Sequence, residues 1–230
     1  MSSFNARTET SSELIELLDK HFWSLIRNDI VHYEYGYETH IDTQVQSSLR
    51  LRQSTTAKHV RFAPDFIVYR KNMLETDYLF EYKVTKTPRY SFNDQQWFYG
   101  QIEADAFDNY MNLINAGVNV AITIYCPYHE RPLLCDIPSI NWIYGVRQRT
   151  STSQGSGTDF YNIDLRKLKT FEEFVSNTMG VSINTINSLL NKNFYSELRN
   201  THSLKTTHYY RSSYNSSDFQ TGFNWLNCYK

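Results

Sequence analysis

Three charged side chains near the middle of the chain have the types and spacing that metal-assisted cleavage of a phosphodiester requires. Asp65 directly follows Pro64, and Glu81 and Lys83 flank Tyr82 in the next apolar segment. Carboxylate oxygens are hard ligands of the kind that Mg²⁺ accepts beside water. A bound Mg²⁺ polarises a phosphodiester oxygen and lowers the pKa of a water ligand, and a lysine orients that water or helps to deprotonate it. We therefore predict that Asp65, Glu81 and the Tyr82 carbonyl bind Mg²⁺, for which Mn²⁺ can substitute, with Lys83 at the attacking water.

These residues fall on two segments that the sequence predicts to be neighbouring strands. β-Prone apolar residues run through 59–69 and 77–85, on either side of a polar stretch, which is typical of an antiparallel hairpin with a longer loop. Because side chains alternate along a strand, Glu81 and Lys83 share one face and meet Asp65 from the adjacent strand. The opposite face anchors the second strand in the core through Phe80, Tyr82 and Val84.

The flanking segments predict helices and strands around this hairpin. Apolar residues, Leu25 among them, recur at helical spacing over 12–28, and β-prone residues alternate with polar ones over 31–41. Residues 94–116 predict a second long helix, and 118–126 is an almost unbroken apolar run, typical of a strand buried on both faces. The order helix, three strands, helix, strand predicts an α/β (α+β) core in which helices flank a mixed sheet.

The rest of the chain predicts an extension of this core. A stretch rich in Ser, Gly and Thr begins at residue 149, and short helices are predicted at 171–176 and 183–190. We place the core at residues 1–148 and a C-terminal extension or subdomain at 149–230. The extension is long enough to serve in substrate recognition or dimerisation.

Pro64-Asp65 followed by Glu81-x-Lys83 resembles the signature of the PD-(D/E)XK nuclease superfamily. The predicted order of elements over residues 12–126 is similar to that family's core. The resemblance implies a restriction-endonuclease-like fold and Mg²⁺-dependent endonuclease activity, usually on DNA. It also implies that Asp65 and Glu81 are metal ligands and that Lys83 is the catalytic lysine.

The resemblance directs attention to four further residues. Many members of the family add a carboxylate from the first helix, where this chain has Glu13 and Glu16, both off the predicted apolar stripe. Gln95 and Tyr99 fit a Gln-x-x-x-Tyr pattern that one branch carries after the catalytic lysine. Such a pair would place an amide and a phenol near the metal-bound water, although 18 tyrosines in the chain make a coincidental match easy.

Composition excludes several classes of protein. The 230 residues carry a formal net charge of −1, which excludes a globally basic nucleic-acid binder but leaves room for a local basic surface. No apolar run approaches the roughly 18 residues of a membrane span, and the first residues lack the apolar region of a signal peptide. Three cysteines in no metal-ligand spacing predict free thiols in a reducing, cytoplasmic location, with no membrane partner.

Basic residues next to the candidate site predict how a nucleic acid would be held. Lys86 and Arg89 directly follow the strand of Lys83, where they would contact DNA phosphates or belong to an ordinary solvated loop. RNA stays open as a substrate. Because one site cuts one strand, a homodimer would cut both strands of a duplex, and a larger nucleoprotein assembly is the alternative.

Two other functions fit the same residues. A protein on the same scaffold that binds or assembles nucleic acid without cutting it would show salt-sensitive binding independent of Mg²⁺. A structural protein in which the strand charges are merely solvated would bind neither metal nor nucleic acid. Within the nuclease class the sequence leaves restriction, transposition, resolution, homing and phage defence open, and restriction-type cleavage by a dimer is the first expectation.

Overall fold

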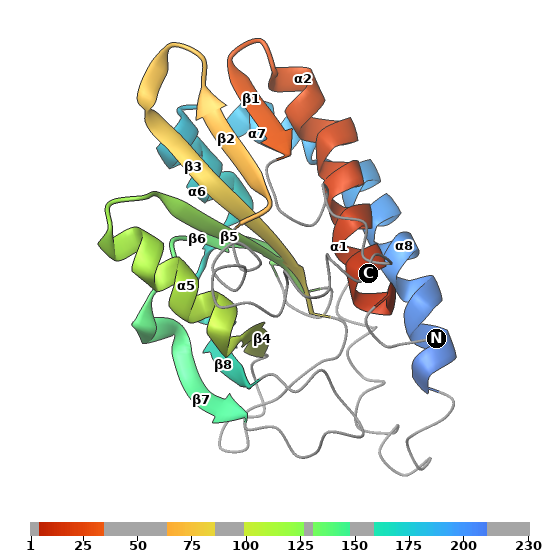
Figure 1. The fold of residues 1–230 in the computed structure, drawn as a ribbon. Helices are drawn as coiled ribbons and strands as arrows, with labels where there is room; N and C mark the ends of the chain where they lie inside the picture. The colour runs from red at the N-terminus through yellow and green to blue at the C-terminus, as the bar shows by residue number, and fades with distance from the viewer. Residues whose placement is uncertain (1–4, 35–63, 86–98, 127–130, 148–158, 211–230) are drawn as a thin grey trace, which may run out of the picture.

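The computed structural model describes residues 5–34, 64–85, 99–126, 131–147 and 159–210, which form three layers around one mixed β-sheet (Figure 1). Helices from both ends of the chain cover one face of this sheet. A helix from the middle of the chain and a small second sheet cover the other face. The predicted mixed α+β architecture, with a mixed sheet flanked by helices, is confirmed.

The strands of the large sheet lie side by side in the order in which they occur in the chain. Its hydrogen-bonded order is β1 (Ile30–Glu34), β2 (Phe66–Arg70), β3 (Met73–Val84), β5 (Val120–Tyr125), β6 (Leu133–Asp136) and β9 (Lys169–Thr170). Every neighbouring pair is antiparallel except β3 and β5, which are parallel.

A parallel pair needs a connection that crosses a face of the sheet. Here the connection contains β4 (Tyr99–Glu103) and α5 (Ala104–Asn115). β4 lies in a separate sheet, in the order β4, β8 (Phe160–Asp164), β7 (Ile143–Arg147). α5 and this sheet therefore form the layer that lies over one face of β3 and β5.

The other layer joins the two ends of the described chain. It consists of α1 (Asn5–Leu18), the π-helical turn η1 (Asp19–Trp23), α2 (Ser24–Ile26), α6 (Phe171–Met179), α7 (Ile183–Leu189) and α8 (Lys192–Tyr210). α1 and α8 lie side by side (Figure 1). Glu197 of α8 also contacts η1, directly after α1, since its carboxylate lies 2.7 Å from the Lys20 ammonium and 2.8 Å from the His21 ring.

β5 shows how the sheet separates two hydrophobic clusters. All six of its residues are buried, which confirms the strand predicted at 118–126. Val120, Ile122 and Ile124 pack with α5 and the small sheet. Ala121 and Tyr125 pack with the helices of the opposite layer. A strand covered on both faces explains the unbroken apolar run in the sequence.

The first helix differs from its prediction because of the π-helical turn. The helix begins at Asn5 rather than near residue 12, and η1 interrupts it. A π turn holds one extra residue, which rotates the following side chains by about 100° relative to an uninterrupted α-helix. Phe22 and Trp23 are both buried in the core, whereas Leu25, predicted to lie on the apolar stripe, is 60% exposed.

The strand predicted at 31–41 is found as β1, but its faces are the reverse of what alternation suggests. Tyr33, on the β-prone face, is 62% exposed. His32, on the polar face, stacks between the rings of Trp23 and Phe66. The residues from 35 to 63 lie outside the described part.

Two other predicted boundaries are wrong. Residues 99–103, predicted as helix, form β4, and the helix begins at Ala104. β4 is a strand because it pairs with β8, some sixty residues later, and local sequence does not reveal such a partner. The β2–β3 loop is also shorter than predicted, because Arg70 pairs with Met73 and leaves a two-residue turn.

The later elements are integrated with the earlier ones. The helices predicted at 171–176 and 183–190 are confirmed as α6 and α7. Their buried residues belong to the same cluster as those of α1 and β3, and β9 extends the large sheet. The predicted boundary at residue 148 lies outside the described residues, and the segments on its two sides share this core.

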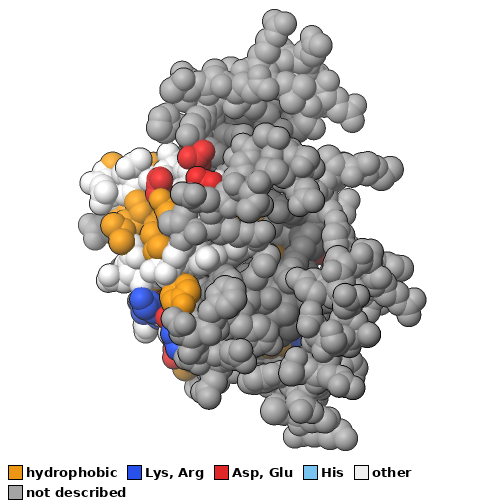
Figure 2. All heavy atoms as spheres, turned by 90° about the horizontal axis from the view of Figure 1, so that it is seen from below, with side chains coloured by type: hydrophobic (Ala, Val, Ile, Leu, Met, Phe, Trp, Pro, Cys, Tyr) orange, Lys and Arg blue, Asp and Glu red, His pale blue; other side chains and the backbone are white. Residues whose placement is uncertain are grey.

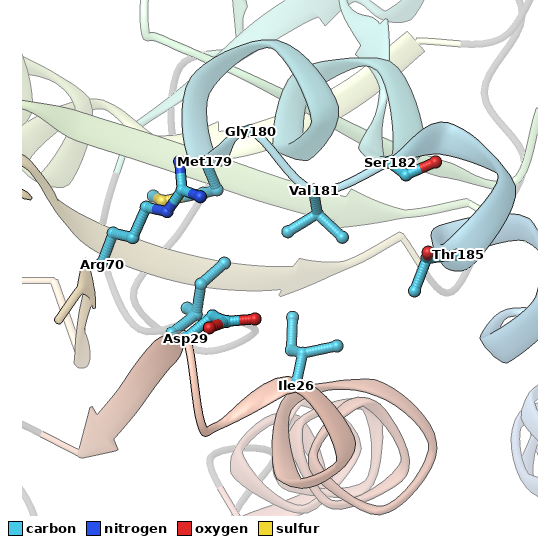
Figure 3. A pocket seen from close by; sticks show the side chains of 9 residues that line it. Ile26, Asp29, Arg70, Met179, Gly180, Val181, Ser182 and Thr185 are labelled. Carbon is cyan, nitrogen blue, oxygen red and sulfur yellow. The ribbon is translucent and has the colours of Figure 1, made fainter. Parts of the chain in front are cut away.

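A cavity of about 180 Å³ opens on the α6 side of the sheet, where the chain leaves that helix (Figure 3). Gly180 ends α6 with a left-handed φ of 67°, a conformation that glycine adopts without strain. The Arg70 guanidinium lies against this glycine, and a Cβ at position 180 would be 2.8 Å from its Nη1. The left-handed φ at the helix end favours glycine here, whereas the flexible tip of Arg70 could shift to admit a Cβ.

The surface of the described part carries no long apolar segment. Figure 2 shows hydrophobic side chains beside acidic and basic ones on its left, the side of α5 and β7 in Figure 1. Ile140 and Tyr144, next to and within β7, are among the exposed large hydrophobic residues. None of the helices in the described ranges has the length and hydrophobicity to cross a bilayer.

Candidate active site

The β2–β3 hairpin brings the predicted catalytic residues together. Phe66 pairs with Phe80 and Ile67 with Leu79, so Asp65, one step before β2, lies at the register position opposite Glu81. The hairpin register therefore determines the juxtaposition of these side chains.

The two faces of β3 have different neighbours, as the strand period predicts. Phe80 and Tyr82 are buried in the cluster beneath α1 and α6. Glu81 and Lys83 face the α5 layer, and their partners across the parallel β3–β5 pair are Ile122 and Ile124. Apolar packing on one face thus holds the strand whose other face carries the charges.

Glu81 and Lys83 form a buried ion pair. The Glu81 side chain is 5% exposed and the Lys83 side chain 32%, and Lys83 Nζ contacts Glu81 Oε1. Burial alone would lower the pKa of the Lys83 ammonium, but the Glu81 carboxylate, which also accepts its hydrogen bond, raises that pKa above its usual value. Asp65 and Glu103 act in the same direction. Lys83 is therefore a cation at neutral pH and a hydrogen-bond donor.

Two residues that the sequence analysis did not single out also belong to this cluster. Tyr110 of α5 is 1% exposed, and its hydroxyl is hydrogen-bonded to Glu81. Burial raises the pKa of this phenol, and the charges of Glu81, Asp65 and Glu103 raise it further. Glu103 is the last residue of β4 and precedes α5. A tyrosine on the apolar face of a helix is typical of a core residue, so the local sequence gave no indication that Tyr110 belongs to the site.

The direction of the Tyr82 carbonyl follows from the backbone hydrogen bonds of β3. Leu79 N donates to Asn119 O and Thr85 N to Tyr125 O, so odd-numbered residues of β3 bond to the β5 side. The Tyr82 carbonyl therefore points toward the side of β2, two residues beyond Phe80, whose partner Phe66 is the first residue of that strand.

Behind the site, an aromatic stack fixes the ring of Tyr82. His32 lies parallel to Trp23, with centroids 5.0 Å apart, and to Phe66, with centroids 4.3 Å apart. His32 Nε2 and the Tyr82 hydroxyl share a hydrogen bond of 2.9 Å. Burial lowers the pKa of His32 from 6.5 to about 3, so this ring is neutral at physiological pH.

The buried His32 predicts a loss of stability in acid. Because its pKa is about 3 when folded and 6.5 when unfolded, the unfolded chain binds the extra proton between these values. The free energy of unfolding should therefore fall as pH drops below 6.5, by about 1 to 2 kcal/mol between pH 7 and pH 5 from this residue. Urea unfolding of wild type and His32→Phe at both pH values measures the difference. Equal losses in the two proteins would contradict the prediction.

The other predicted site residues either lie outside the described part of the chain or belong to a different element from the one predicted. Lys86, Arg89 and Gln95 lie outside the described residues. Tyr99 is in a strand rather than in the first turn of a helix, so the helical geometry assumed for the Gln-x-x-x-Tyr pattern is wrong.

The first-helix carboxylates lie on the layer opposite to Glu81. α1 contributes Leu14, Leu17 and Leu18 to the cluster that contains Phe80 and Tyr82. Of the two carboxylates named from the sequence, Glu16 is exposed and Glu13 is half-buried.

The donors of the predicted site suit a magnesium ion that keeps several water ligands, rather than a metal ion whose ligands are all supplied by the protein. Among the residues that the structure describes, no three His, Cys, Asp or Glu side chains are arranged to hold a metal. Mg²⁺ usually binds one or two carboxylates and keeps water or phosphate oxygens in its remaining positions. Asp65 and Glu81, with the Tyr82 carbonyl, would supply such a partial shell.

Comparisons of the chain with family models, with curated proteins and with solved structures found no match. The functional argument therefore depends on the residues and on their geometry.

Proposed function

We propose that this protein is a Mg²⁺-dependent endonuclease that hydrolyses phosphodiester bonds in DNA, built on a restriction-endonuclease-like core. The observation that carries the proposal is the buried Glu81–Lys83 pair on β3, with Asp65 opposite on the adjacent strand. An ion pair buried beside a second carboxylate is costly as a structural device, and perturbed groups of this kind concentrate at functional sites.

The topology supports the same proposal. α1, the β1–β2–β3 meander, the crossover through α5 and the parallel strand β5 follow the order expected for this type of nuclease core. α1 and α5 lie on opposite faces of the sheet. The additional strand β4 precedes α5 and leaves the β3–β5 pairing intact.

Each residue has a definite chemical task in this proposal. Asp65, Glu81 and the Tyr82 carbonyl would hold the metal at the scissile phosphate. When bound, Mg²⁺ supplies charge neutralisation and lowers the pKa of a water ligand. Water attacks phosphorus and gives up a proton to solvent, the bond to the leaving oxygen breaks, and that oxygen is protonated by solvent. Lys83, as an ammonium, donates hydrogen bonds to a phosphate oxygen or to the attacking water and stabilises the charge that develops there.

A cleavage assay tests the proposal directly. Purified wild type and Lys83→Ala are incubated with supercoiled plasmid, linear duplex, single-stranded DNA and branched DNA, each with Mg²⁺, Mn²⁺ or EDTA. We expect metal-dependent cutting by wild type and a rate about 100- to 1,000-fold lower in folded Lys83→Ala. Equal cutting by the variant would contradict the assignment of Lys83. Salt-sensitive binding with no cutting under any metal condition would favour the non-cutting nucleic-acid-binding alternative.

Oligomeric state determines the product on duplex DNA. One site cuts one strand, so the proposed homodimer would make double-strand breaks, whereas a monomer would nick. The relative amounts of nicked and linear plasmid at early times, compared over a range of protein concentrations, distinguish the two.

A further inference from the structure

Tyr110 occupies a position from which it can act on Glu81. Tyr110 lies in α5 with Ala106 and Phe107, and all three are buried against the sheet. The same cluster contains Ile122, which is the β5 residue paired with Glu81. The helix therefore brings the phenol over the carboxylate from the side opposite to the aromatic stack.

The phenol and the carboxylate satisfy each other's hydrogen bonding. Tyr110 is 1% exposed and Glu81 4%, so water has little access to either group. A buried hydroxyl is almost always hydrogen-bonded, and the bond of Tyr110 goes to Glu81. The phenol donates and the carboxylate accepts, because a carboxylate has no proton to give.

Glu81 therefore has two partners with different mobility. Lys83 reaches it with a flexible stem, and the Lys83 side chain is 32% exposed. Tyr110 is held by the packing of a buried helix face, and its ring has only two rotatable side-chain bonds. When Lys83 turns toward a phosphate, Tyr110 is the partner that remains on the carboxylate.

We propose that Tyr110 is a positioning residue of the metal site, whose hydroxyl fixes the Glu81 carboxylate so that its remaining lone pairs face the metal. This inference rests on the proposed function, because it concerns the same carboxylate. Partners that orient metal ligands typically change metal affinity or activity by 10- to 100-fold when they are removed. Tyr110 would act through Glu81 and would not contact the substrate.

The test compares two tyrosines that each donate to a glutamate. Tyr110→Phe removes the bond to Glu81, and the control Tyr195→Phe removes the 2.6 Å bond from Tyr195 to Glu172 in the opposite layer. Mn²⁺ binding to each protein is measured by electron paramagnetic resonance, and cleavage rates are measured over a range of Mn²⁺ concentrations. Circular dichroism and thermal unfolding report on the fold.

We expect Tyr110→Phe to need about 10- to 100-fold more Mn²⁺ for half-saturation and for half-maximal cleavage. Saturating Mn²⁺ should restore most of its rate, its KM for DNA should be unchanged, and Tyr195→Phe should match wild type. A purely structural role would lower the rate at every metal concentration, which would overturn the inference. Unchanged Mn²⁺ dependence in Tyr110→Phe would overturn it as well.

Failure of the premise is distinguishable from failure of the inference. If wild type neither binds Mn²⁺ nor cuts DNA, the proposed function is wrong and the inference falls with it. If wild type does both and only the Tyr110→Phe effect is missing, the role of Tyr110 alone is wrong. Should Tyr110→Phe be unfolded without metal, recovery of the native circular dichroism on adding Mn²⁺ supports the inference, and no recovery overturns it.

Discussion

Replacing Asp65 with asparagine is expected to abolish metal-dependent cleavage while leaving the protein folded. Asp65→Asn keeps the size of the side chain but removes one of two neighbouring carboxylate charges, one directly before β2 and the other on β3. Asp65 is half-buried at the end of the hairpin, so the fold should tolerate the change. Since an amide is a poor ligand for Mg²⁺, we expect cleavage to fall by about 1,000-fold or more and calorimetric Mg²⁺ binding to disappear.

Asp136→Asn is the matched control for this experiment. Asp136 is also a strand carboxylate of the large sheet, but it lies in β6 and pairs with Lys169 at 3.1 Å. Its replacement should leave cleavage unchanged. If Asp65→Asn cuts DNA as fast as the wild type, Asp65 is not a metal ligand. If Asp136→Asn loses as much cleavage as Asp65→Asn, the losses reflect a general effect of charge on DNA binding.

Breaking the Glu81–Lys83 pair should lower the free energy of unfolding more than the other substitutions for which a stability effect is predicted. In Lys83→Met the buried Glu81 carboxylate loses its countercharge, and removal of one partner of a buried pair typically costs about 3–5 kcal/mol. We expect about 3 kcal/mol, because Lys83 is partly exposed. The double variant Glu81→Leu/Lys83→Met should recover most of this loss. Urea unfolding of the wild type, both single variants and the double variant provides the measurement.

Two comparisons determine how this result is read. Lys169→Met removes the partner of Asp136 at an exposed site and should cost less than about 1 kcal/mol. Added Mg²⁺ should stabilise Lys83→Met more than wild type, because the ion replaces the missing positive charge beside Glu81. If the double variant is no more stable than Lys83→Met, the destabilisation arises from lost packing rather than from the uncompensated carboxylate.

Much of the core could be predicted because its signals are local. The apolar run of β5 and the alternation along β3 are each contained within a few residues. The meeting of Asp65 with Glu81 was predicted from two neighbouring strands, although the two-residue turn that sets their register was predicted as a longer loop. The two-residue period also predicted correctly that Phe80 and Tyr82 face away from Glu81 and Lys83.

The features that sequence did not predict depend on distant partners. β4 is a strand because β8 hydrogen-bonds to it, and in isolation its residues continued a helical pattern into α5. The π-helical turn depends on packing of Phe22 and Trp23 against the sheet. Tyr110 is one of 18 tyrosines, and only the packing of α5 over β3 distinguishes it from the others.

The pairing of the first helix with the last has a consequence for how the protein is made. A ribosome releases the chain from its N-terminus, yet Leu14 and Phe22 share their hydrophobic cluster with Phe194 and Leu198. The contact between Lys20 and Glu197 spans 177 positions of the chain. During synthesis the part of the α1 surface that packs against α8 therefore stays uncovered until α8 has emerged, and contacts of such long separation form slowly. Until then this apolar surface is open to aggregation of the nascent chain.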